Sequence, residues 1–166
     1  MKRVSALFMM AVLAVLSCLP GLAEAKTIKL TAAKPVATVT IPDSWKPEEY
    51  DLGVEAQSPD DEVYVAVEVS SVKGLENAAI EALKFYQKQG VTLQGDPVQS
   101  EHKLNGMDVV DLAWKGRDKD GEAEVSLSFV VVSESRILLL YYWGSPKGGE
   151  KHRQALSGIL NSIKRL

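Results

Sequence analysis

The sequence predicts an α+β domain, a meandering antiparallel sheet of about six to seven strands with one inserted helix and one C-terminal helix packed on it. Three observations predict this fold class. Most segments alternate between apolar and polar residues with the period of two that marks half-buried strands. Residues 75–89 and the C-terminal segment instead carry apolar side chains at helical spacing. No internal repeat and no linker divides the chain, which indicates a single domain.

A secretory signal peptide is predicted at residues 1–25. Lys2 and Arg3 form a short cationic start, and residues 4–19 are an apolar run that is too short to span a bilayer comfortably. Ala23-Glu24-Ala25 then supplies the small residues at positions −3 and −1 that signal peptidase requires. We therefore expect a periplasmic or secreted protein that has no membrane-spanning segment after cleavage.

A second interpretation of this leader stays open. Val15-Leu16-Ser17-Cys18 is loosely similar to a bacterial lipobox, in which the cysteine is acylated and becomes the mature N-terminus. Leu16 is larger than is usual in that motif, and a better cleavage site follows at Ala25. Cleavage after Ala25 leaves one domain, residues 26–166.

The composition of this domain excludes several classes of function. Its 141 residues are enough to bury a core, and its 17 basic and 21 acidic side chains give a net charge of about −4. That charge argues against nucleic acid and anionic lipid as partners, because both attract basic surfaces. Cys18 is the only cysteine of the chain, so cleavage after Ala25 removes the means for disulfides, thiol catalysis and cysteine-ligated metal.

The first half of the domain is predicted to form three strands and a helix. Residues 36–41 and 52–57 are short strands that end in proline-containing turns, and in residues 63–70 the valines share one face. Gly90 directly follows the helix at 75–89, at the position of a left-handed C-cap. The apolar stripe of this helix is predicted to be Leu75, Ala79, Ala82, Leu83 and Tyr86.

The middle of the chain is predicted to form a hairpin. An irregular stretch at 91–97 leads into a strand at 98–104. Asn105-Gly106 then indicates a type I′ turn, because both central residues of that turn need a positive φ angle. The return strand covers residues 107–115.

Two further strands and a helix complete the prediction. The strand at 123–131 alternates between apolar and polar residues. The strand at 137–143 is apolar at both odd and even positions, as expected of a central strand covered on both faces. A loop at 145–149 precedes the final helix, which starts at about Glu150. We expect one core to contain Trp114, Phe129, Leu139 and Ile159.

The order of these elements resembles the PsbP-like fold. The matching positions all maintain a fold and run from about residue 36 onward: Ile41-Pro42-Asp43-Ser44-Trp45, the helix at 75–89, Leu104-Asn105-Gly106, Tyr141 and Tyr142, and the closing Ser162-Ile163-Lys164. That fold is shared by the extrinsic PsbP subunit of photosystem II, a Ran-binding import factor of yeast and many small exported bacterial proteins. The family has no shared active site and its members serve mostly in binding or assembly, so the resemblance implies a non-enzymatic role.

No catalytic residue, cofactor or metal site is predicted from the motifs. His102 and His152 have no partners at a spacing that indicates a catalytic base or a zinc site, so we expect both to be exposed to solvent. Asp118-Lys119-Asp120-Gly121 is similar to the start of a calcium loop, but it lacks the downstream acidic ligands. Asp-Gly turn chemistry explains that segment fully.

The candidate contact region for a partner lies in the early turns and consists of Trp45, Glu48, Glu49, Asp60 and Asp61. Trp45 lies between two prolines, where it either caps the core or is an exposed aromatic anchor. The acidic residues form either solvated turns or a patch that attracts a basic partner.

The leading functional hypothesis is an exported binding or assembly protein, without catalysis, whose protein partner is unidentified. The alternative is a carrier or sensor of a small apolar ligand held between the sheet and a helix. A filled core would favour the first hypothesis, and a deep apolar cavity would favour the second. An enzyme would need titratable residues that converge in a cleft.

Overall fold

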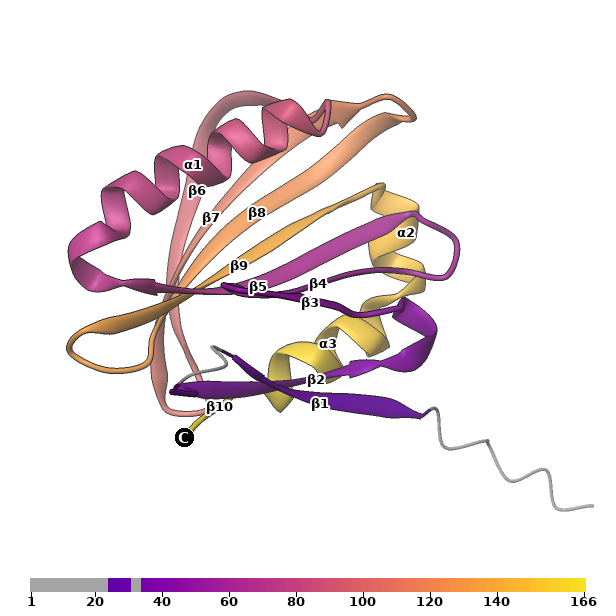
Figure 1. Ribbon diagram of the computed structural model, residues 1–166. Helices are drawn as coiled ribbons and strands as arrows, with labels where there is room; N and C mark the ends of the chain where they lie inside the picture. The colour runs from indigo at the N-terminus through magenta and orange to yellow at the C-terminus, as the bar shows by residue number, and fades with distance from the viewer. Residues whose placement is uncertain (1–23, 31–33) are drawn as a thin grey trace, which may run out of the picture.

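The computed structural model describes residues 24–30 and 34–166. Cys18 and nearly all of the predicted signal peptide lie outside the described residues. The described residues form three layers: helix α1 (Leu75–Lys88), a large antiparallel sheet, and a layer that combines a small sheet with helix α3 (Arg153–Ser162) (Figure 1). The predicted α+β class is confirmed.

The large sheet contains seven of the described strands in the order β3-β4-β5-β9-β8-β7-β6. Two meanders build it, and the pairing of β5 with β9 from Val63↔Gly144 to Ser71↔Arg136 joins them. β9 is the central strand and is buried on both faces, as predicted. The strands are β3 (Glu48–Tyr50), β4 (Gly53–Gln57), β5 (Val63–Ser71), β6 (Thr92–Leu104), β7 (Met107–Asp118), β8 (Gly121–Val131) and β9 (Arg136–Gly144).

The small sheet brings the two ends of the described chain together. It consists of β1 (Ala25–Leu30), β2 (Ala37–Pro42) and the two-residue β10 (Lys164–Arg165), with β2 in the centre. Of these strands, only β2 was predicted from the sequence. β1 has just two apolar side chains in alternation, Ile28 and Leu30, and β10 is too short for any periodicity.

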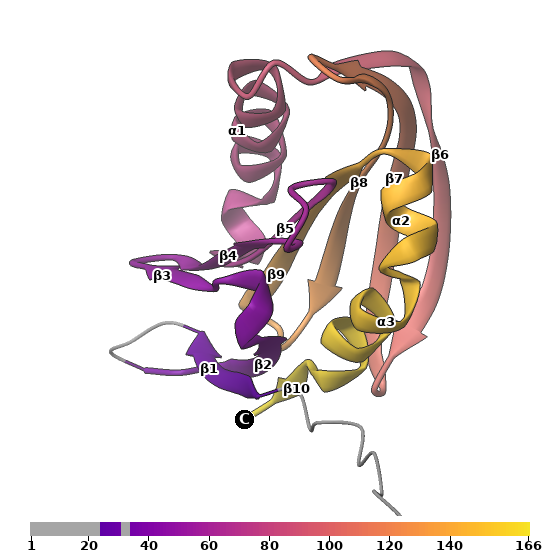
Figure 2. The ribbon, with the colours of Figure 1, turned by 90° about the vertical axis from the view of Figure 1, so that its right-hand side faces the viewer.

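The helices lie on opposite faces of the large sheet (Figure 2). α1 covers one face, and α3 lies with the small sheet against the other. Short helices connect the elements: η1 (Asp43–Trp45) after β2, η2 (Val72–Gly74) before α1, and α2 (Pro146–Lys151) before α3. Within residues 24–30 and 34–166, no helix is long and apolar enough to cross a membrane.

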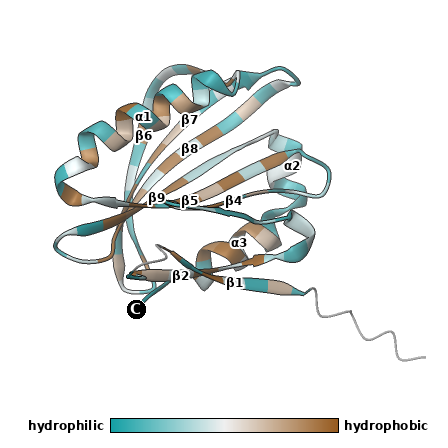
Figure 3. Cartoon of the chain, viewed as in Figure 1, coloured by the Kyte–Doolittle hydropathy of each residue, from teal (hydrophilic) through white to brown (hydrophobic). Residues whose placement is uncertain are grey.

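The side chains of the large sheet are divided between two hydrophobic cores. Leu139 is buried in the core under α1, and Trp114 and Phe129 pack at its edge. Ile159 of α3 belongs to the core on the opposite face, so the prediction of one shared core is wrong for this residue. The prediction failed because alternation identifies the two faces of a strand but not which helix covers each. In Figure 3 hydrophobic residues gather on the inner strands and on α3, while α1 alternates between hydrophobic and hydrophilic residues.

Two segments that were predicted to be irregular are regular. Residues 91–97 mostly belong to β6, where a register shift between Gln94 and Val98 lets the strand pass Pro97 at the exposed edge of the sheet. Residues 145–149 start α2 instead of a loop. The Ser145 side chain caps this helix by accepting the N–H of Gly148, and Pro146 occupies its first turn.

The buried stripe of α1 is rotated from the predicted one. Ala82 and Tyr86 are buried and Phe85 packs beside them, whereas Leu75 and Leu83 are exposed on the outer side. The helix contacts the sheet along a narrow line, so only part of its apolar surface is covered. The predicted C-cap is confirmed, because Gly90 has a φ angle of 81°. Positive φ angles at Asn105 and Gly106 likewise fit the predicted turn.

Candidate functional site

A pocket of about 230 Å³ opens where α1 leaves the β3–β4 side of the large sheet uncovered. Strands β3, β4, β5 and β9 and helix α1 all contribute to it. We call it the Tyr–Glu pocket; its lining is Glu48, Glu49, Tyr50, Glu55, Tyr64, Ala66, Glu68, Phe85 and Tyr141.

The register of the sheet explains the hollow. Glu48, Glu55, Ala66 and Tyr141 are direct neighbours across four adjacent strands. Side chains in such a row point to the same face. The small Ala66 therefore forms a low floor between larger residues. In the next row Tyr50 is opposite Gly53, which has no side chain.

Three tyrosines anchor two glutamates in this pocket. Tyr50 and Tyr141 donate hydrogen bonds to the two carboxylate oxygens of Glu68, with O···O distances of 2.9 and 2.6 Å. Tyr64 donates to Glu55 at 2.6 Å. Both glutamates are half-buried. The phenols therefore hold the two carboxylates in place without neutralising them.

The electrostatics of the Tyr–Glu pocket are those of an acceptor for positive charge. No lysine, arginine or histidine lines it, and among the described residues only Lys26 pairs with one of its glutamates, Glu49, at a distance of 2.5 Å. Burial, reinforced by the neighbouring glutamates, raises the pKa of Tyr50, Tyr64 and Tyr141 well above the usual range. These phenols thus stay protonated as donors to the carboxylates at neutral pH.

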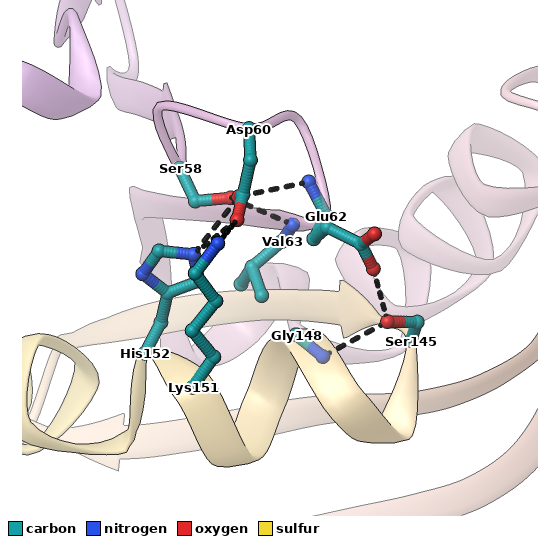
Figure 4. Close-up of polar contacts among 8 residues, drawn as sticks. All are labelled: Ser58, Asp60, Glu62, Val63, Ser145, Gly148, Lys151 and His152. Carbon is teal, nitrogen blue, oxygen red and sulfur yellow. Dashed lines mark hydrogen bonds and ion pairs between the residues drawn. The ribbon is translucent and has the colours of Figure 1, made fainter.

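A second polar cluster, the Asp60 network, ties the β4–β5 turn to helices α2 and α3 (Figure 4). Its members are Ser58, Asp60, Lys151 and His152. The Asp60 carboxylate accepts a hydrogen bond from Ser58 Oγ at 2.6 Å and pairs with Lys151 Nζ at 2.6 Å. His152 Nε2 lies 2.9 Å from both of its oxygens. Lys151, followed by Ser58 and His152, holds the pKa of Asp60 well below its usual range.

The Asp60 network has the residue types of a catalytic triad but not the geometry. Ser58 Oγ donates to the carboxylate instead of contacting the imidazole, and it also accepts the N–H of Val63 at 3.0 Å. Ser58 is buried, so a substrate has no access to it. A triad serine must contact its base and face the substrate. These contacts connect segments of the chain and leave no free nucleophile.

The predicted contact residues fall into different environments. Trp45 is only 2 % exposed and packs in the core, so it is not an exposed anchor and its alternative role as a cap of the core is the correct one. Glu48 and Glu49 line the Tyr–Glu pocket. Asp60 is engaged in the Asp60 network, and Asp61 is exposed beside it.

The other residues singled out in the sequence have structural roles. His102 is exposed as predicted and lies 3.1 Å from Asp111. The prediction that His152 is solvent-exposed is wrong: its side chain is only 13 % exposed and its ring packs edge-on against Trp45 at 5.5 Å. Asp118 Oδ1 accepts the N–H of Asp120 and of Gly121, which makes a hairpin turn. Within residues 24–30 and 34–166, no group of three or more acidic, histidine or cysteine side chains could hold a metal ion.

Two other cavities bear on the alternative hypothesis. One of about 200 Å³ lies between the large sheet and α3 and is mostly apolar, with Leu140, Leu156 and Leu160 in its lining. A larger cavity of about 520 Å³ is polar and is lined by turns at one end of the sheet, among them Asp61 and Asp120. Neither combines the depth and apolar lining of a typical pocket for a drug-sized ligand.

Two solved structures share this arrangement of elements. LpqN of Mycobacterium tuberculosis, which is involved in cell envelope biogenesis, has a TM-score of 0.54 and 14 % identity, over 85 % of this chain and 91 % of LpqN. The cyanobacterial PsbP protein CyanoP of Synechocystis has a TM-score of 0.55 and 12 % identity, over 91 % of this chain and 99 % of CyanoP.

The chain has the PsbP-like fold. The resemblance predicted from the sequence is thereby confirmed. At such low identities the likeness concerns the fold alone. No protein-family model and no curated protein matches the chain.

Most of the Tyr–Glu pocket was not predicted from the sequence. Glu48 and Glu49 were proposed as contacts, but Tyr50 was given no role, and Glu55, Glu68 and the other aromatic residues were assigned only to strands or to the helix. One signal was present in β5, where the apolar valines face one way and Tyr64, Ala66 and Glu68 the other. A glutamate next to a tyrosine on an inward-facing row indicates a polar site.

Proposed function

We propose that this protein is an exported, non-catalytic binding or assembly protein that holds a basic protein partner at the β3–β4 side of its large sheet. The observation that carries this proposal is the set of four glutamates around the Tyr–Glu pocket, which no basic side chain lines. Negative charge concentrated at an open concave site speeds the encounter with a basic partner and makes it sensitive to salt.

A binding role accounts for the polar clusters better than catalysis does. The serine and histidine of the Asp60 network are taken up by contacts within the chain. In the Tyr–Glu pocket the carboxylates have donors but no nucleophile beside them. A reaction centre needs a nucleophile, base and stabilising donors that converge on one point.

The proposal is tested by capture of partners from the envelope fraction of the native host. A triple charge reversal, Glu48→Lys, Glu49→Lys and Asp61→Lys, should abolish capture of the basic proteins that the wild-type chain retains. A matched variant with three reversals on the far edge strand β6 and on α1, Asp96→Lys, Glu101→Lys and Glu81→Lys, changes the net charge equally and should retain them. Equal capture by both folded variants would contradict the proposal.

The alternative function, a carrier of a small apolar ligand, is favoured by one observation. The apolar cavity between the sheet and α3 has about 200 Å³. An apolar cavity of similar size is known to take molecules as small as benzene. A carrier would therefore show a higher melting temperature in the presence of benzene, and Leu156→Phe, which fills the cavity, would remove the effect.

A further inference from the structure

We infer that the Tyr–Glu pocket binds an organic ammonium group, either the head of a small free cation or the side chain of a lysine on a protein partner. The inference deepens the proposed function and rests on it only for the second of these sources. Three properties of the pocket lead to this class of ligand: uncompensated charge, aromatic walls and size.

The charge comes from two fixed carboxylates. Glu55 and Glu68 are half-buried, and their hydrogen-bond partners in the described part of the chain are phenols. Neither forms an ion pair with a lysine, arginine or histidine among the described residues. Because partial burial weakens the solvation of a carboxylate, a cation that enters the pocket gains more from each charge than it would at an open surface.

Part of the pocket wall consists of aromatic rings that pack against one another. Phe85 lies edge-on to Tyr141 with ring centroids 5.7 Å apart, and it is tilted against Tyr64 at 5.9 Å. Tyr64 is itself stacked on Trp143 at 4.0 Å, which limits its motion. Ring faces attract ammonium groups, and cages of such rings are the usual binding sites for methylated ammonium ions.

The size and the donor set argue against a metal ion as the ligand. About 230 Å³ is less than the 300–1,000 Å³ that drug-sized ligands need, but it suits one head group. Calcium requires six to eight oxygen ligands around one point, and the described residues contain no cluster that could hold a metal. A soft, partly apolar cation matches a lining of rings and carboxylates better than a strongly hydrated metal ion does.

The first measurement is a titration of the purified protein followed by the aromatic proton signals in NMR spectra. Choline is the probe for a free cation, and 3,3-dimethylbutan-1-ol, its uncharged carbon isostere, is the control. For a protein source the probe is the peptide acetyl-Gly-Lys-Gly-amide, with norleucine in place of lysine as the control. We expect saturable shifts of the Phe85 and Tyr141 ring signals with at least one cationic probe and none with the neutral isosteres.

Two conservative variants separate charge from ring chemistry. Glu68→Gln keeps the shape of the side chain and should weaken binding of the cationic probe about tenfold. Phe85→Leu keeps an apolar wall but removes the ring face, and it should weaken binding severalfold. The matched controls are Glu81→Gln on the exposed side of α1 and Phe129→Leu on β8, outside the pocket. Both controls should bind as the wild-type chain does.

Three results would overturn the inference: no saturable shift with either cationic probe, equal binding of a cation and its neutral isostere, or unchanged binding by both folded pocket variants. The outcome is independent of the capture experiment. If the wild-type chain binds a cationic probe but the charge-reversed variant still captures the partners, the proposed function is contradicted and this inference stands. If the charge-reversed variant loses the partners but the wild-type chain binds no cationic probe, this inference is contradicted and the proposed function stands.

Discussion

At the scale of single residues, two glycines show how the surroundings decide the effect of one methyl group. A Cβ atom on Gly53 would lie 1.9 Å from the Val67 carbonyl oxygen of the neighbouring strand, whereas one on Gly158 in α3 would meet nothing within 4 Å. Gly53→Ala should therefore lower the free energy of unfolding by about 1–3 kcal/mol. Gly158→Ala should raise it by about 0.5–1 kcal/mol, because alanine loses less conformational entropy in a helix.

Equilibrium unfolding in urea measures both glycine variants. Opposite signs are the diagnostic result. A Gly53→Ala variant as stable as the wild-type chain would show that β4 and β5 do not approach each other this closely.

Tyrosine ionisation is the second residue-scale prediction. Burial raises the pKa of all five tyrosines, and the neighbouring glutamates add to the effect at Tyr50, Tyr64 and Tyr141. Because the pKa is higher in the folded state, the stabilisation is complete below the unfolded value of about 10 and is lost as the pH rises above it. Absorbance at 295 nm should show that the tyrosines ionise at a higher pH in the native protein than in the protein unfolded in urea. Native tyrosines that titrate near pH 10 would contradict the burial of these phenols.

At the scale of elements, the Asp60 network connects the β4–β5 turn to the end of α2 and the start of α3. The pKa of Asp60 is lowered in the folded state, so its stabilisation is present above the unfolded pKa of about 3.9 and is lost as the pH falls. The wild-type chain should lose stability between pH 5 and pH 2, and Asp60→Asn should reduce that loss. Asp61→Asn is the matched control, since Asp61 has a positive φ angle that asparagine tolerates and lies outside the network.

The measurement for Asp60 is the free energy of urea unfolding at several acidic pH values. If Asp60→Asn and Asp61→Asn change the pH dependence equally, the network contributes nothing specific to folding.

The two hydrophobic cores lead to a prediction of additivity. Leu139 and Ile159 are both buried, but they lie in separate clusters on opposite faces of the large sheet. Truncation of either to alanine should lower the free energy of unfolding by about 2–5 kcal/mol. Because the residues share no cluster, the double variant should lose the sum within about 0.5 kcal/mol. A large coupling energy would show that the cores are not independent.

At the scale of the whole molecule, the predicted cleavage site lies at the start of β1. Lys26 to Leu30 pair with β2, and Ile28 and Leu30 are buried. Cleavage after Ala25 removes only the first residue of β1 and the Glu24 carbonyl that accepts the N–H of Asp43, and it keeps the buried side chains of β1. We predict that the protein is exported, begins at Lys26 after cleavage and carries no lipid, which intact-mass spectrometry of the native protein checks. A mass that corresponds to a diacylated Cys18 would contradict this prediction.

The large sheet and α1 were largely predictable because burial is encoded locally in their periodicity. The valines of β5 and the doubly apolar β9 identified strands in the interior, and Asn105-Gly106 identified a turn by its backbone requirement. The short strands β1, β3 and β10 could not be predicted in this way. β3 has no buried side chain, and β1 and β10 depend on β2 to form at all.

The sequence by itself determined the fold class and the order of the main elements, because these follow from local periodicity. Only the tertiary structure decided that Trp45 is buried, since the exposure of a turn residue depends on what packs over it. It also decided the Tyr–Glu pocket: Tyr50 and Tyr141 reach the same carboxylate of Glu68 from positions 18 and 73 residues away. Local patterns carry no record of such distances, because strand pairing brings these residues together only after the chain has folded.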